Sequence, residues 1–257
     1  MRALYTAATG MNAQQLRIDN IANNLANVST VGFKKSRESF EDLVYQGMPV
    51  GNVDEETERP TSLAVGTGTR LVAMSRDFSN GDLQYTGNPL DIGIGGRGFF
   101  TIEGNDGIQR YTRDGQLQVN RDGELVTQAG YQVSPGIEVP MDALQIMVAE
   151  DGTVSAVYED ATEAVTLGTL EIVDFVNSSG LRNMGGNLYT ASPTSGEPIP
   201  VDPSEGTVRI QQGFLEASNV DVAEELVTLI VAQRSFELTS KVVQTADETL
   251  EIVARLK

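Results

Sequence analysis

The residue types that most often carry catalysis are missing from this sequence. Its 257 residues include no Cys, no His and no Trp. Without thiols or imidazoles there can be no disulfide, no thiolate or imidazole metal site, and no Ser-His-Asp, Cys-His or His general-base catalysis within the chain. Only carboxylate, Lys, Tyr or hydroxyl chemistry is left, so most classes of enzyme are excluded.

Two motifs have the composition of ligand-binding loops. Residues 93–98 (GIGGRG) match the G-x-G-x-x-G spacing of dinucleotide-binding proteins. That motif needs a helix next, to hold the pyrophosphate, but the strand-like run FFTI (99–102) follows, so a tight turn between strands is favoured. The acidic run 54–58 lacks the residue alternation of a calcium loop. We therefore expect no metal site and no cofactor.

Acidic residues beside glycine are the remaining candidates for chemistry. Asp114 and Asp122 each stand between an Arg and a Gly, and two such carboxylates could form a glycosidase pair. Asp-Gly and Asn-Gly dipeptides between strand-like runs are, however, typical of hairpin turns. Five of them occur here, at 80–81, 106–107, 114–115, 122–123 and 151–152. We expect turns at these positions and no enzymatic activity.

Charge divides the chain into three parts. Lys and Arg total 18 against 36 Asp and Glu, a net charge of −18. Residues 1–37 carry +4, residues 217–257 carry −3, and residues 38–216 carry −19. Phosphate-bearing partners need a basic footprint, so we expect no nucleic-acid binding. No stretch approaches the roughly 18 apolar residues of a membrane span, so we expect no lipid insertion.

Apolar residues recur every seven positions near both ends, and this spacing predicts two long helices that pair as a coiled coil. The alternative is that the two helices do not pair and that each buries one face on its own globular core. Gln14 is the one polar interruption of the first row, and Gly10 weakens that helix. The expected interface residues are Leu4, Met11, Ile18, Ile21, Leu25 and Val28 in the first helix and Val222, Leu226, Leu229, Phe236, Val243, Leu250 and Val253 in the second.

The ends of these helices also have sequence signals. The first should end near Val28, with Gly32 as a left-handed cap and Lys34 placed where the helix dipole favours a cation. Ser218 or Asn219 should cap the second, which then runs to position 256. Four asparagines in the first helix are either a solvated face or a polar surface between helices: Asn20, Asn23, Asn24 and Asn27.

Between the helices, short β-rich runs separated by turns predict an all-β region. The fold class is therefore α+β: an N-terminal helix in 1–35, an extended and irregular linker in 36–70, a central β domain in 71–216 and a C-terminal helix in 217–257. Residues 46–69 are long, polar and acidic, and loops of that length are usually functional or disordered.

Several segments resemble the bacterial flagellar rod and hook proteins. Residues 22–34 (ANNLANVSTVGFK) are similar to that family's A-N-N-L-A-N-V-N-T-T-G-F-K signature and depart from it at Ser29 and Val31. Segments 86–102 and 111–127 resemble its β-domain core, and 213–250 its carboxy-terminal helix. Chain length, residues 46–69 and the approach VGTGTR point within the family to distal-rod members. A proximal rod or hook-type subunit is the alternative.

The resemblance implies a structural subunit of a rigid helical tube that transmits motor torque to the hook and lets export substrates pass. In such a subunit the terminal helices pair in the inner tube, the β domain lies outside, and the 46–69 region is associated with a stiff shaft. Expected partners are copies of the chain itself, proximal rod proteins, the hook protein and, in a Gram-negative envelope, the surrounding periplasmic rings.

The implied location is the basal body, in the cell envelope and periplasm. Export would use the flagellar type III channel without a cleaved signal peptide, in keeping with an amino-terminal segment that has no secretory apolar run. A secreted β-domain glycosidase and an adhesin-like binding module are the rivals from other classes.

Overall fold

A computed structural model describes residues 2–47, 64–104, 106–158, 164–203, 206 and 208–255. The chain divides into two compact units. We call Met1–Ala26, Ser36–Ser75 and Asp221–Lys257 the helical unit, and Asn27–Lys35 with Arg76–Val220 the β unit. The expected α+β class, with a helix towards each end and a β-rich region between them, is confirmed. Among the helices described, none is long and apolar enough to cross a membrane.

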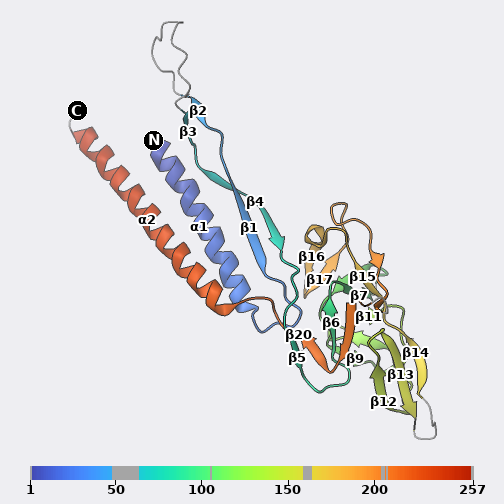
Figure 1. Cartoon of the computed structure of the whole chain (residues 1–257). Coiled ribbons are helices and arrows are strands. Elements are labelled where there is room, and N and C mark those ends of the chain that lie inside the picture. Colours follow the sequence, from blue (N-terminus) through green and yellow to red (C-terminus); the bar gives the residue numbers. More distant parts are fainter. Residues whose placement is uncertain are drawn as a thin grey trace. The chain divides into compact units, whose positions relative to one another are not determined.

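In the helical unit, α1 (Arg2–Ala26) and α2 (Val222–Arg255) lie side by side and run antiparallel (Figure 1). Asn24 Nδ2 donates to Glu225 Oε1 at 3.5 Å. Near the other end of α1, a Cβ added at Gly10 would lie 3.6 Å from Thr239 Cγ2. Residue 24 of α1 therefore lies beside residue 225 of α2, and residue 10 lies beside residue 239, which is the register of an antiparallel pair.

Strands accompany the helices in the same unit. Strand β1 (Ser36–Asp42) pairs with β4 (Thr69–Arg76), and β2 (Gln46–Gly47) pairs antiparallel with β3 (Ala64–Val65). Both ends of the predicted linker are therefore extended, paired backbone. Most of the 46–69 segment, residues 48–63, lies outside the described residues.

The helix ends differ from the prediction in detail. Helix α1 ends at Ala26, two residues before Val28, and Gly32 has the left-handed φ of 67° expected of it. Asp221, rather than Ser218 or Asn219, caps α2: its Oδ1 accepts the N–H of Ala223 at 2.8 Å and that of Glu224 at 3.2 Å. A carboxylate at this position also favours the positive end of the helix dipole.

The β unit is built on a nine-stranded sheet. Its main path runs β16-β17-β8-β7-β11-β10-β9, and β15 joins β7 to β18. These strands are β7 (Phe99–Glu103), β8 (Gln109–Thr112), β9 (Leu117–Val119), β10 (Leu125–Thr127), β11 (Gln132–Val133), β15 (Ile172–Asp174), β16 (Arg182–Gly185), β17 (Leu188–Thr190) and β18 (Ile199–Pro200).

Smaller sheets complete the unit. A three-stranded sheet has the order β12-β13-β14, and two antiparallel pairs join β19 to β6 and β20 to β5. A 3-10 turn, η1 (Ser178–Gly180), follows β15. The strands are β5 (Leu83–Tyr85), β6 (Ile92–Gly96), β12 (Ala143–Val148), β13 (Thr153–Tyr158), β14 (Val165–Thr169), β19 (Val208–Gln212) and β20 (Phe214–Glu216).

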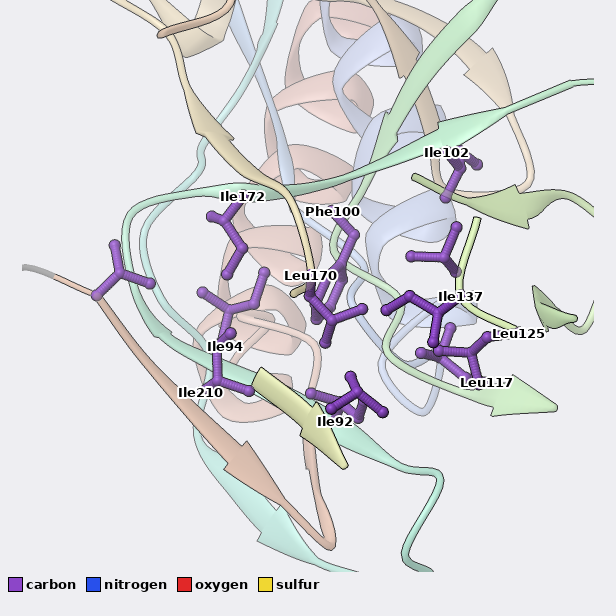
Figure 2. Packing of buried hydrophobic residues seen from close by; sticks show 13 residues of the cluster. Ile92, Ile94, Phe100, Ile102, Leu117, Leu125, Ile137, Leu170, Ile172 and Ile210 are labelled. Atoms are coloured by element: carbon purple, nitrogen blue, oxygen red, sulfur yellow. The ribbon is translucent and has the colours of Figure 1, made fainter. Parts of the chain in front are cut away.

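Two apolar clusters hold the β unit together. The larger is aliphatic apart from Phe100: Ile92, Ile102 and Ile210 are among its other almost fully buried members, and Figure 2 shows their side chains converging. The smaller is mainly aromatic and consists of Phe99, Tyr111, Val173, Phe175 and Tyr189. Burying each large side chain contributes about 1.5–3 kcal/mol, so this core accounts for the folding of the unit.

The turn predictions are confirmed in most places. In the glycine-rich run 93–98, residues 93–96 belong to strand β6 and only Arg97 and Gly98 form the tight connection to β7. No helix follows the run, so it is not a dinucleotide loop. The dipeptides at 106–107, 122–123 and 151–152 close antiparallel hairpins, each with its glycine at positive φ. Gly81 and Gly115 serve a different purpose. A Cβ there would lie 2.0 Å from Ala217 O and 1.7 Å from Ile92 O, so only glycine allows these backbone approaches.

Candidate assembly interface

One face of α2 is turned towards α1. Along the helix, one row of side chains with reduced exposure is spaced alternately three and four residues apart, as in a heptad repeat. Beside this row, Glu225, Thr228, Ser235 and Ser240 are also half-buried. Ala232, in the middle of this face, is 0% exposed. We call this face the seam of α2, and its members are Leu229, Ala232, Phe236, Thr239, Val243 and Ala246.

The predicted interface residues fall into three groups. Ile21 is buried, and Leu4, Met11, Ile18, Leu25, Leu229, Phe236 and Val243 are half-buried in the helical unit. Val222, Leu226 and Leu250 are exposed. Val28 is half-buried in the β unit, beyond the end of α1, and the side chain of Val253 lies outside what the structure describes.

A second face of α2 is apolar and exposed. Leu238, the most open of its members, is 66% exposed. Their spacings of four, seven, four and ten residues place these side chains on one side of the helix, away from the seam, with Arg234, Thr245 and Thr249 between them. We call them the outer face: Val227, Val231, Leu238, Val242 and Ile252. Leu229, Phe236 and Val243 of the seam were among the predicted interface residues, whereas this second stripe was not predicted as a face of its own.

Two of the four asparagines connect α1 to strand β1. Buried Asn24 donates to Ser36 O at 3.0 Å and accepts the N–H of Ser36 at 2.9 Å. Buried Asn20 donates to the same carbonyl at 2.9 Å and to Glu38, which also lies 3.3 Å from Arg17 Nε. Neither a solvated face nor a surface between helices describes this arrangement fully. Both side chains bond mainly to the backbone of Ser36, so they hold the start of strand β1 against α1.

In the β unit, a buried ionic cluster holds the loop that follows α1. Lys34 Nζ lies 2.7 Å from Glu216 Oε1, and Arg113 Nη1 lies 3.1 Å from Glu216 Oε2. All three side chains are almost fully buried. Burial lowers the pKa of Lys34, and the neighbouring Glu216 carboxylate opposes that shift. Lys34 was expected at a helix terminus, but its charge is balanced inside the unit instead.

Backbone contacts secure the same loop. The N–H of Gly32 donates to Glu216 O at 2.8 Å, and Asn187 Nδ2 donates to Val31 O at 2.8 Å. A Cβ at Gly32 would lie 2.8 Å from the Arg113 carbonyl carbon. The second part of the signature segment, residues 27–34, is thus a tightly packed part of the β unit, whereas residues 22–26 end α1 in the helical unit.

Comparison with known proteins agrees with these features. Three family models match: "Flagella basal body rod protein" over residues 4–34, "Flagellar hook protein FlgE/F/G D1 domain" over 93–156 and "Flagellar basal body rod FlgEFG protein C-terminal" over 211–256. The flagellar basal-body rod protein FlgG of Borreliella burgdorferi is 47% identical over 100% of this chain and 99% of its own length. FlgG of Bacillus subtilis is 40% identical, with the same coverage.

The helix pair, the β unit and these matches define a structural subunit of the flagellar rod and hook class. The chain belongs to the family of flagellar basal-body rod protein FlgG. It is a structural subunit of the distal rod in the flagellar basal body and not an enzyme, and membership implies assembly with other rod and hook components. FlgF of Caulobacter vibrioides is only 34% identical, so a proximal rod or hook-type subunit is not favoured.

Proposed function

We propose that this chain polymerises into a rigid helical tube whose inner wall is made by its terminal helices. The observation that carries the proposal is the outer face of α2, an apolar stripe left open on a helix whose opposite side already packs on α1. At 1.5 Å per residue, the stripe from Val227 to Ile252 extends over roughly 37 Å. A row of exposed apolar side chains gathered on one side of a helix is typical of an interaction site.

The partner that fits this stripe is another copy of the chain. A heterologous contact repeated by one rotation and one translation gives an open helical assembly, as a rod requires. The seam supports pairing of α1 with α2 as a coiled coil, because its alternating spacing is that of an a/d repeat. Together the seam would hold each helix pair and the outer face would join neighbouring pairs.

The remaining assignments follow from the family. Residues 1–35 and 217–257 would form the inner tube, 71–216 the outer β domain and 36–70 the stiffening segment. The tube would carry torque from proximal rod proteins to the hook protein and let export substrates pass. In a Gram-negative envelope it would cross the periplasm inside the surrounding rings, after export through the flagellar type III channel without a cleaved signal peptide.

Two aspartate variants separate the two faces. Leu238→Asp should abolish tube formation and leave the unfolding of the monomer nearly unchanged, because the side chain is already in solvent. Phe236→Asp should abolish tubes and also destabilise the helical unit by a few kcal/mol, because it places an unpaired carboxylate in the seam. Gln244→Asp, on the exposed polar side of α2, is the matched control and should assemble normally.

Electron microscopy and motility report assembly, and circular dichroism of the monomer reports folding. Normal tubes from Leu238→Asp would contradict the role of the outer face. Normal tubes from Phe236→Asp would show that the seam is not needed for assembly.

A further inference from the structure

The β unit carries an open cavity that its structural role leaves unexplained. The cavity measures about 490 Å³. Phe78 and Phe99 form its apolar part, and Arg97 and Arg113 bring two guanidinium groups to it. We call it the arginine pocket.

Arg113 has a hydrogen-bond donor left over. It is 3% exposed, its Nη1 is paired with Glu216 and its Nη2 donates to Gly96 O at 2.9 Å. Its guanidinium also lies 5.3 Å from the centre of the Phe99 ring. The buried Nε–H finds no acceptor among the described residues. A buried unpaired donor costs about 1–3 kcal/mol, so an acceptor that reached this nitrogen would be favoured.

Arg97 is the adjustable member of the pair. Its side chain is 68% exposed, and its two recorded contacts are long: 3.5 Å to Asp174 Oδ2 and 3.4 Å to Phe175 O. The guanidinium can therefore turn towards a new partner without breaking a strong interaction. Arginine is well suited to this purpose, because its planar fork binds a carboxylate through two parallel hydrogen bonds.

The charge around the pocket favours an anion. Among the described residues that line the pocket, two arginines, Arg97 and Arg113, face one carboxylate, that of Asp174. Behind the lining, Glu216 is shared between Arg113 and Lys34, and the charge of Lys34 also interacts with Asp77. This local excess of positive charge occurs in a chain that carries twice as many acidic as basic residues. Arg113 is buried beside the Phe99 ring, and a charge pair is stronger where the surroundings are less polar.

We propose that the arginine pocket receives a carboxylate side chain from a neighbouring copy of the chain. The inference rests on the proposed function, because polymerisation is what brings copies together. The acidic region 38–216, with its net charge of −19, supplies many carboxylates for this contact. The pocket would turn part of a repulsive surface into a specific contact between subunits.

Zero-length crosslinking tests the proposal directly. A carbodiimide joins an amine to a carboxylate only when the two are in contact, and residues 38–216 contain no lysine of their own. The variant Arg97→Lys therefore introduces a single amine at the pocket. Arg121→Lys, at an exposed turn of the same unit, is the matched control. Both are assembled, treated with the carbodiimide and separated on a denaturing gel.

We expect assembled Arg97→Lys to give several-fold more covalent dimer than its dilute monomer and than assembled Arg121→Lys. Mass spectrometry should then place the new amide at position 97, joined to an acidic residue of another copy. If tubes form but the only link at position 97 is internal, to Asp174, the inference is wrong and the proposed function stands. If the unaltered chain forms no tubes, the proposed function fails and the inference falls with it.

Discussion

Glu216 is the residue on which the buried charge of the β unit depends. Its two carboxylate oxygens contact Lys34 and Arg113, and Oε1 also accepts the N–H of Gly81 at 2.8 Å. Removing one partner of a buried ion pair leaves the other charge uncompensated, which typically costs 3–5 kcal/mol.

We therefore expect Glu216→Gln to lower the free energy of unfolding of the β unit by about 3–5 kcal/mol. Urea unfolding followed by the near-ultraviolet signal of the tyrosines measures it, since the chain has no Trp. Glu103→Gln, an exposed carboxylate on β7, is the control and should stay within about 0.5 kcal/mol of the parent chain. Equal stability of the two variants would mean that the cluster contributes nothing.

Asp114 gives a pH-dependent prediction. Burial raises the pKa of this carboxyl above its ordinary 3.8, and repulsion from Asp91 adds to the shift, while the N–H of Gln116 opposes it. A carboxyl whose pKa is raised by folding destabilises the folded chain at pH values above that folded-state pKa, and the penalty disappears below the unfolded value.

The variant Asp114→Asn keeps the acceptor for Gln116 and removes the charge. It should be more stable than the parent at pH 7. The gain should shrink as the pH falls through the folded-state pKa and vanish near pH 3.8. Urea titrations at several pH values check this, and a gain that grows on acidification would contradict the assignment.

At the scale of single residues, local patterns were predictable and distant partners were not. The left-handed conformation of Gly32 could be predicted from the residues around it, and so could the hairpin turns at Gly107, Gly123 and Gly152. Glu216 stands 182 positions from Lys34 and 103 from Arg113, so no local pattern signals their contact. The one local sign of the contact is Glu216 itself, at the end of the run FLE (214–216), because a carboxylate in a buried strand needs a partner.

At the scale of elements, Gly10 of α1 is a position where the helix can be improved. A Cβ there would make an ordinary contact of 3.6 Å with Thr239 Cγ2. Gly10→Ala should therefore stabilise the helical unit by about 1 kcal/mol, because alanine has the higher helix propensity.

Gly68→Ala provides the contrast in the same unit. Gly68 has a φ of 126°, and its Cβ would lie 2.2 Å from Thr9 Oγ1, so this variant should be destabilised. Thermal unfolding followed at 222 nm measures both changes. A destabilised Gly10→Ala would show that the two helices approach more closely at this level than the structure has them.

The elements themselves were largely predictable because each has a local cause. Heptad spacing predicted α1 and α2, and Asp-Gly pairs predicted three hairpins. The prediction missed that α1 uses Asn20 and Asn24 to hold β1, because the strand partner lies outside the heptad pattern. It also missed the outer face of α2, since a seven-residue row describes only one side of a helix.

At the scale of the whole molecule, net charge should govern assembly. The net charge of −18 makes copies of the chain repel one another, and salt screens charges farther apart than about 8 Å at physiological strength. Apolar contacts between helices are not weakened by salt.

We expect polymerisation of the purified chain, measured by light scattering, to improve as salt rises from low to physiological concentration. Tubes that form more readily at low salt would mean that attractive ion pairs dominate over the general repulsion. In that case ion pairs formed by the acidic surface would stabilise the assembly, and the net charge would not oppose polymerisation.

The central claim is that the terminal helices build the inner wall of a tube. Cryo-electron microscopy of tubes assembled from this chain, at a resolution that separates helices, tests it most directly. We predict α1 and α2 at the smallest radius around an open channel, with the outer face of α2 against a neighbouring copy and the β unit outside. A map in which the β unit lines the channel, or in which the outer face of α2 stays in solvent, would contradict this account.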